Sequence, residues 1–124
     1  LFVILTDGEE NASRSFTNRD VKKRIQHQTD VYKWGFVFLG ANQDAFATGQ
    51  EMGIASSMCL NINTDSAAEV QRTGRILGRA ATNYRAAAPS VMESAINLSA
   101  IADEVDAEEN KSNSTTKKKT RKGK

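Results

Sequence analysis

The chain opens with Leu1-Phe2-Val3-Ile4-Leu5-Thr6-Asp7-Gly8. Five consecutive apolar residues without polar alternation are typical of a strand in a parallel sheet, where helices cover both faces. The Thr-Asp-Gly sequence that follows predicts a tight turn, which places the carboxylate of Asp7 at the carboxyl end of the strand. Ligands of open α/β sheets bind at this edge. We therefore expect a strand that is buried on both faces and ends at a candidate site. An opening this abrupt is also what we expect of a fragment.

Two further apolar runs alternate with helical patterns along the chain. Residues 34–41 predict a second buried strand, and residues 56–62 predict a weaker third strand. Thr17 and Asp20 have the spacing of a capping box at the start of the first helix, and Gly53 is suited to end the second. This alternation predicts an α/β fold with a parallel sheet.

The apolar stripes of the helical segments predict which faces are buried. On the first helix the stripe consists of Val21, Ile25 and Tyr32. A long helix is expected from Thr64 or Asp65 to about Ala88, with Val70, Leu77, Ala81 and Tyr84 on one stripe. Pro89 ends it, and a Ser90–Glu93 capping pattern starts an additional amphipathic helix over residues 89–105.

The charged residues divide the chain of 124 residues unevenly. Residues 1–102 carry ten basic and ten acidic side chains, residues 103–110 carry five acidic ones, and residues 111–124 carry seven basic ones. Residues 106–124 contain almost no apolar side chains, so they cannot bury enough surface to offset the entropy cost of ordering. We expect one small domain over residues 1–88, the additional helix, and a disordered acidic-then-basic tail over residues 106–124.

Cysteine content and hydropathy indicate a cytoplasmic protein. Cys59 is the only cysteine, which excludes an internal disulfide and any multi-cysteine metal site. We expect it to be a core residue. No apolar run approaches the roughly 20 residues of a membrane helix, so no membrane partner is expected.

A candidate metal site follows from the expected parallel sheet. Asp7 and the turn at residues 42–44 then leave neighbouring strands at the same edge, about 4.8 Å apart. Oxygen donors suit Mg²⁺, Ca²⁺ or Mn²⁺ better than zinc. The simpler alternative is that Asp7 closes a turn and that Asn42 or Asp44 caps a helix. The candidate residues are Thr6, Asp7, Asn11, Ser13, Asn42 and Asp44.

Two of these segments resemble a known family. The sequence Val-Ile-Leu-Thr-Asp-Gly-Glu-Glu-Asn, at residues 3–11, resembles the fourth strand and following loop of a von Willebrand factor A-type (vWA) domain. Residues 34–45 resemble a branch of bacterial and phage cytoplasmic proteins with this domain. The resemblance covers residues 1 to about 85. It implies that this chain is the C-terminal half of a three-layer, Rossmann-like fold with helices on both faces of its sheet.

The resemblance also implies that Asp7 belongs to a metal-ion-dependent adhesion site (MIDAS). The family's site further needs an Asp-x-Ser-x-Ser loop and a later Thr, which both precede the Thr-Asp-Gly strand and are absent from this chain. The resemblance therefore assigns a metal-binding role to Asp7 only. We expect this chain alone to bind Mg²⁺, Ca²⁺ or Mn²⁺ weakly or not at all. The family's strand order would place its first strand beside residues 1–6, so this strand should be an unprotected edge here.

The function we expect is that of a protein-binding module, which captures an acidic group of an unknown protein partner through a divalent ion, and not that of an enzyme. One alternative is an enzyme fragment resembling an α/β hydrolase or phosphatase. It lacks a Gly-rich phosphate loop and a nucleophile–base pair, and we expect the single histidine, His27, to lie at the surface. The other is nonspecific nucleic-acid binding by the Lys/Arg tail. The basic triplet at residues 22–24 favours a solvated helix face over nucleic-acid binding.

Overall fold

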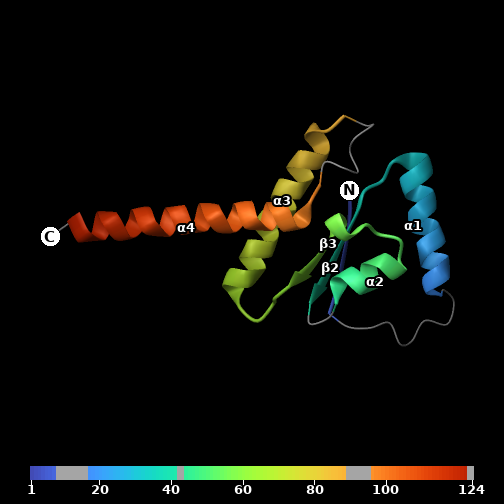
Figure 1. The fold of residues 1–124 in the computed structure, drawn as a ribbon, viewed down its shortest axis with the longest axis horizontal. Helices are drawn as coiled ribbons and strands as arrows, with labels where there is room; N and C mark the ends of the chain where they lie inside the picture. Colours follow the sequence, from blue (N-terminus) through green and yellow to red (C-terminus); the bar gives the residue numbers. More distant parts are fainter. Residues whose placement is uncertain (8–16, 42–43, 89–95, 123–124) are drawn as a thin grey trace.

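The computed structural model describes residues 1–7, 17–41, 44–88 and 96–122 (Figure 1). Strands and helices alternate along the chain, followed by a long final helix. The predicted α/β class is confirmed. The elements are β1 (Phe2–Thr6), α1 (Asn18–Tyr32), β2 (Phe36–Ala41), α2 (Ala45–Glu51), the short 3₁₀ helix η1 (Ser56–Met58), β3 (Cys59–Ile62), α3 (Ala67–Ala86) and α4 (Leu98–Lys122).

The three strands form one parallel sheet in the order β1-β2-β3. The register runs from Phe2 beside Phe36 to Thr6 beside Gly40, and Ala41 lies beside Ile62. β2 is the central strand, and it is buried along almost its whole length. This position suits the apolar sequence of β2, because both of its faces are covered.

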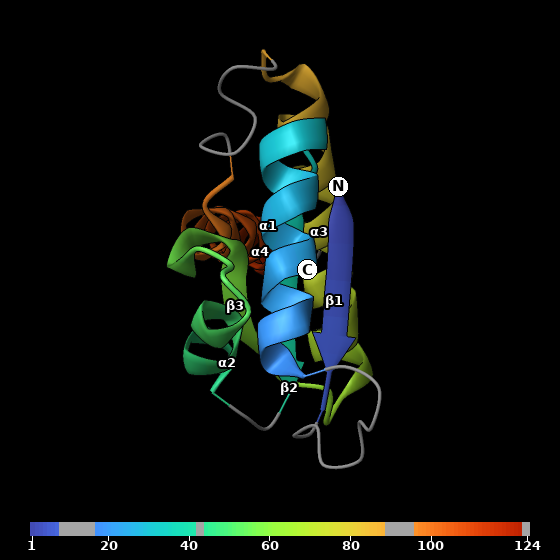
Figure 2. The same cartoon turned by 90° about the vertical axis from the view of Figure 1, so that its right-hand side faces the viewer.

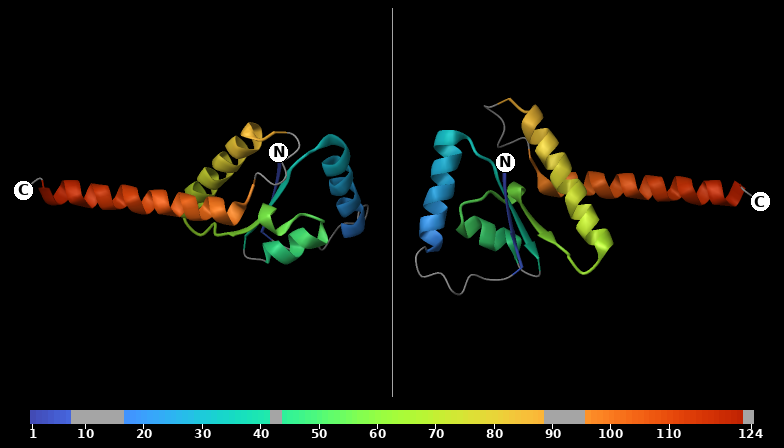
Figure 3. Two further views of the ribbon diagram at one scale, coloured as in Figure 1. Left: turned by 45° about the horizontal axis from the view of Figure 1, so that its top comes forward. Right: turned by 180° about the vertical axis from the view of Figure 1, so that it is seen from behind.

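The helices are distributed on both sides of this sheet. In Figures 1 and 3, α1 and α2 lie on one side and α3 and α4 on the other. A Cβ atom added to Gly49 of α2 would collide with Sγ of Cys59, so α2 packs directly on the sheet. On the opposite side, Tyr84 of α3 lies against Gly35, and its hydroxyl donates a hydrogen bond of 2.8 Å to the carbonyl of Lys33.

β1 is not buried on both faces, so that prediction is wrong. It forms an edge of the sheet, as Figure 2 shows, and the side chains of Phe2 and Leu5 are 50% and 64% exposed. The physical reason is that β1 has a strand neighbour on one side only, β2. The expectation that this strand is an unprotected edge is confirmed for the part of the chain that the structure describes.

The predicted helix signals are confirmed at α1 and α2. Thr17 and Asp20 form the complete capping box, and the hydrogen bonds from Thr17 lower the pKa of the Asp20 carboxyl group. Gly53 follows α2 with a φ of 79°, a left-handed conformation that favours glycine. α3 begins after Ser66, whose side chain caps it, and not at Thr64 or Asp65.

The buried faces of α1 and α3 were predicted only in part. Ile25 is buried in α1, whereas Tyr32 is exposed because it lies at the end of the helix. In α3 the buried residues are Ile76, Ala80 and Tyr84, which are spaced four apart. Val70 is 52% exposed, because it lies in the first turns of α3, ahead of the segment that packs on the core.

α4 continues as a helix to Lys122, through residues for which the sequence predicted a disordered tail. Residues 89–95, with the predicted Ser90–Glu93 capping pattern, lie outside the described residues. Leu98, Ala102 and Val105 of α4 are buried, as the apolar stripe of the additional helix predicts, and Ile101, which was not on that stripe, is buried as well. Among the described residues, no helix is both long and apolar enough to cross a membrane.

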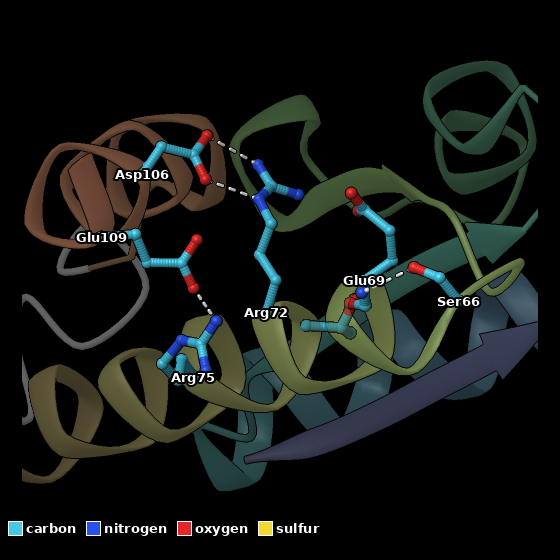
Figure 4. A network of polar contacts seen from close by, with 7 residues as sticks. Ser66, Glu69, Arg72, Arg75, Asp106 and Glu109 are labelled. Carbon is cyan, nitrogen blue, oxygen red and sulfur yellow. Dashed lines mark hydrogen bonds and ion pairs between the residues drawn. The ribbon is translucent and has the colours of Figure 1, made fainter. Parts of the chain in front are cut away.

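Ion pairs to α3 hold the acidic part of α4. The guanidinium of Arg72 donates two hydrogen bonds to the carboxylate of Asp106, with lengths of 2.6 and 3.0 Å. Paired bonds of this kind fix the orientation of both groups. We call the whole set of ion pairs the α3–α4 clasp, and Figure 4 shows the pairs of Arg72 with Asp106 and of Arg75 with Glu109. Its members are Arg72, Arg75, Arg79, Glu104, Asp106, Glu108 and Glu109.

The contact between α2 and β3 makes Gly49→Ala destabilising. The new methyl group has no room beside Cys59, and overpacking of a core costs about 1–3 kcal/mol. The matched control is Gly74→Ala in α3, where a Cβ meets no atom within 4 Å. There the better helix propensity of Ala should stabilise the protein by about 0.5–1 kcal/mol. Urea unfolding measures both changes, and equal effects of the two variants would contradict this packing.

The α3–α4 clasp should also make stability depend on pH. The hydrogen bonds from Arg72 lower the pKa of the Asp106 carboxyl group. The stabilisation is therefore present above the ordinary Asp pKa and is lost as the pH falls through the lowered value. We expect Asp106→Asn to lower the free energy of unfolding at pH 7 and to differ less from the wild type at pH 3. Asp30→Asn on α1 is the control, and a deficit that stays constant with pH would contradict the assignment.

Candidate functional site

The carboxyl ends of the three strands meet at one edge of the sheet. The register places Thr6 beside Gly40 and Ala41 beside Ile62, so β1, β2 and β3 end side by side. Asp7 follows β1 directly, and its side chain is exposed. The structure thus confirms the arrangement on which the candidate site was built, and it leaves the Asp7 carboxylate at the surface of this edge.

Asp44 has a structural role at the same edge. Its Oδ1 atom accepts hydrogen bonds of 3.1 Å from the backbone N–H groups of Phe46 and Ala47. Asp44 is therefore the N-cap of α2, as the simpler alternative predicted. Because Oδ1 already accepts these two hydrogen bonds, Asp44 has less capacity to coordinate a metal ion.

Asn61 belongs to this edge and was missed by the sequence reasoning. It lies in β3, and its Oδ1 atom accepts a hydrogen bond of 2.8 Å from the backbone N–H of Ala45. This bond ties β3 to the start of α2. The available signal was an amide side chain within an otherwise apolar strand. Together, Asn61 and Asp44 satisfy the first three N–H groups of α2.

Of the remaining candidate residues, the structure describes Thr6. Thr6 is the last residue of β1 and is partly buried. The structure therefore brings Thr6, Asp7 and Asp44 to one edge. The other three candidates, Asn11, Ser13 and Asn42, lie outside the described residues.

The chemistry of Asp7 is compatible with a role as one ligand of a metal ion. Asp7 supplies an exposed carboxylate oxygen, the ligand type that Mg²⁺, Ca²⁺ and Mn²⁺ prefer. In residues 1–7, 17–41, 44–88 and 96–122, no three His, Cys, Asp or Glu side chains come together in a group that could hold a metal ion. A single carboxylate leaves such an ion mostly hydrated, so Asp7 needs further ligands to hold it firmly.

The two residues with other reactive side chains lie away from this edge. Cys59 is completely buried, and burial raises the pKa of its thiol, which opposes formation of the reactive thiolate. The prediction that Cys59 is a core residue is confirmed. His27 is exposed on α1, as expected, and its ring contacts the ring of Tyr32 with centroids 5.8 Å apart.

An apolar surface adjoins the edge strand, and the exposed aromatic residues Tyr32 and Trp34 extend the unprotected edge that the sequence predicted. The rings of Phe2, Trp34 and Phe36 contact one another, with centroids 5.7–6.5 Å apart. Exposed apolar side chains grouped in this way mark an interaction site or a tendency to aggregate. We call it the β1 surface, and its exposed residues are Leu1, Phe2, Val3, Leu5, Tyr32 and Trp34.

Comparisons with known proteins give no relative from which a role could be transferred. No protein-family model matches the chain, and neither a curated protein nor a solved structure matches it.

The β1 surface should make the isolated chain self-associate or dissolve poorly. An edge strand with unpaired backbone groups and apolar side chains can pair with another strand. We expect an apparent mass that rises with concentration in size-exclusion chromatography with light scattering. Leu5→Lys should suppress the rise, whereas Val70→Lys adds the same charge at an exposed apolar residue of α3 and should not. A wild-type chain that stays a monodisperse monomer would count against this prediction.

Proposed function

We propose that this chain is part of a vWA-type, Rossmann-like domain that binds a protein partner through a divalent cation. In this proposal, Asp7 is the residue of the adhesion site that this chain supplies. The observation that carries it is the exposed carboxylate of Asp7 at the carboxyl edge of a parallel sheet. The proposed protein is cytoplasmic and acts without a membrane partner.

The position of β1 supports this assignment. The strand that ends in Thr-Asp-Gly lies at the edge of the sheet, with apolar side chains exposed on both of its faces. A vWA-type domain has its first strand at this place, beside the Thr-Asp-Gly strand. A neighbouring strand there would pair the outer backbone groups of β1 and cover Val3 and Leu5.

The chemistry of the edge suits binding rather than catalysis. Asp7 would hold the ion, directly or through a water molecule. A bound Mg²⁺, Ca²⁺ or Mn²⁺ supplies an open coordination position that accepts the acidic group of a protein partner. The carboxylate fixes the place of the ion and takes no part in breaking a bond. Asp44 and Asn61 keep α2 and β3 in place beside it through their bonds to the first turn of α2.

Paramagnetic broadening by Mn²⁺ tests this site even when binding is weak. In two-dimensional NMR spectra of the full chain, we expect low Mn²⁺ concentrations to broaden the amide signals at the strand ends first, at Thr6, Asp7 and Ala41. Asp7→Asn should abolish this local broadening, because it removes the charged oxygen. Titration calorimetry with Mg²⁺ should show weak binding or none.

The matched control is Asp30→Asn, which removes one exposed carboxylate from α1 and should leave the pattern unchanged. Two results would contradict the proposal. The first is broadening at the strand ends that persists in Asp7→Asn. The second is broadening confined to the acidic residues of α4. Micromolar Mg²⁺ affinity that is lost in Asp7→Ala would instead show that this chain forms a complete site.

A further inference from the structure

The second half of α4 projects away from the rest of the molecule as a single helix (Figures 1 and 3). Every side chain from Asn110 to Lys118 is exposed. Residues 111–122 contain six basic residues and no acidic one. We call this segment the basic arm, and its charged residues are Lys111, Lys117, Lys118, Lys119, Arg121 and Lys122.

The α3–α4 clasp removes the nearest source of neutralising charge. In the sequence, the acidic residues that precede the basic arm could fold back and screen it. In the structure several of these carboxylates are paired with α3: Asp106 with Arg72, and Glu108 with Arg79 at 2.7 Å. Glu109 is paired with Arg75. The acidic segment therefore anchors the helix, and the side chains of Lys111, Lys117 and Lys118 face solvent.

We propose that the basic arm binds duplex DNA through its phosphate groups. Lys and Arg side chains that neutralise phosphates release condensed counterions, and this release supplies sequence-independent affinity. The inference goes beyond the proposed adhesion site, because it uses neither Asp7 nor the edge of the sheet.

The composition of the basic arm favours phosphates over other anionic surfaces. A helix that lies on a membrane needs an apolar face, and residues 110–122 contain no apolar side chain. Single-stranded nucleic acid is held largely by stacking of bases on aromatic rings, and the same residues contain no aromatic side chain. Contact with the backbone of a duplex needs neither feature.

The helical geometry favours DNA over RNA. The major groove of B-form DNA admits an α-helix, whereas the major groove of A-form RNA is too narrow for side chains to read. At about 1.5 Å per residue, the basic arm is roughly 18 Å long. Lys117 and Lys118 are consecutive and lie about 100° apart around the helix axis. They can therefore approach phosphates on both sides of a groove.

Binding to a random-sequence DNA duplex, measured by fluorescence anisotropy at several NaCl concentrations, tests the proposal. We expect affinity to fall steeply with salt. Log affinity falls as log salt rises. Replacing Lys111, Lys117 and Lys118 together by Gln should make this slope shallower by about 2.7 and weaken binding roughly tenfold or more.

The matched control replaces Lys22, Lys23 and Arg24 by Gln. These residues are exposed on α1 and carry the same charge, so this variant should keep the wild-type slope. Thermal unfolding checks that both variants fold. An equal loss in the two variants would show an effect of net charge alone and overturn the proposal. Binding to an RNA duplex, or to vesicles of anionic lipid, as tight as binding to DNA would also overturn it.

Discussion

The parallel pairing of β2 with both of its neighbours is the interaction on which the structure depends. It buries the apolar segment Val37-Phe38-Leu39, whose side chains are at most 1% exposed. It also sets the register that brings Thr6 beside Gly40 and Ala41 beside Ile62. Because parallel strands end at the same edge, this one pairing fixes both the core and the place where the polar residues meet.

That constraint explains the contrast between the two ends of the chain. β1 is held on one side only, so its apolar side chains stay exposed and its outer backbone groups face away from the sheet. α4 is held by its apolar residues Ile101 and Val105 and by the α3–α4 clasp, whose last member along the chain is Glu109. The candidate adhesion site and the basic arm therefore both lie where the packed core ends.

Local signals in the sequence predicted local structure. The capping box of Thr17 and Asp20, the left-handed Gly53 and the central strand at residues 36–41 each depend on neighbours within a few positions. The burial of β1 was predicted wrongly, because an apolar run does not reveal how many strands lie beside it. The helical tail was missed because Arg72 and Asp106 are 34 residues apart, and no periodicity joins them. For the site, Asp7 and the cap Asp44 were predicted, and Asn61, whose bond to Ala45 spans 16 residues, was not.

Amide hydrogen exchange along β1 tests the open edge most directly. Phe2 donates its N–H to the carbonyl of Gly35, so alternate residues of β1 point their N–H groups toward β2, and those of Val3 and Leu5 point outward. In dilute solution, we predict fast exchange at Val3 and Leu5 and slow exchange at Ile4 and in β2. Protection of Val3 and Leu5 equal to that of Leu39, at every protein concentration, would contradict an open edge strand.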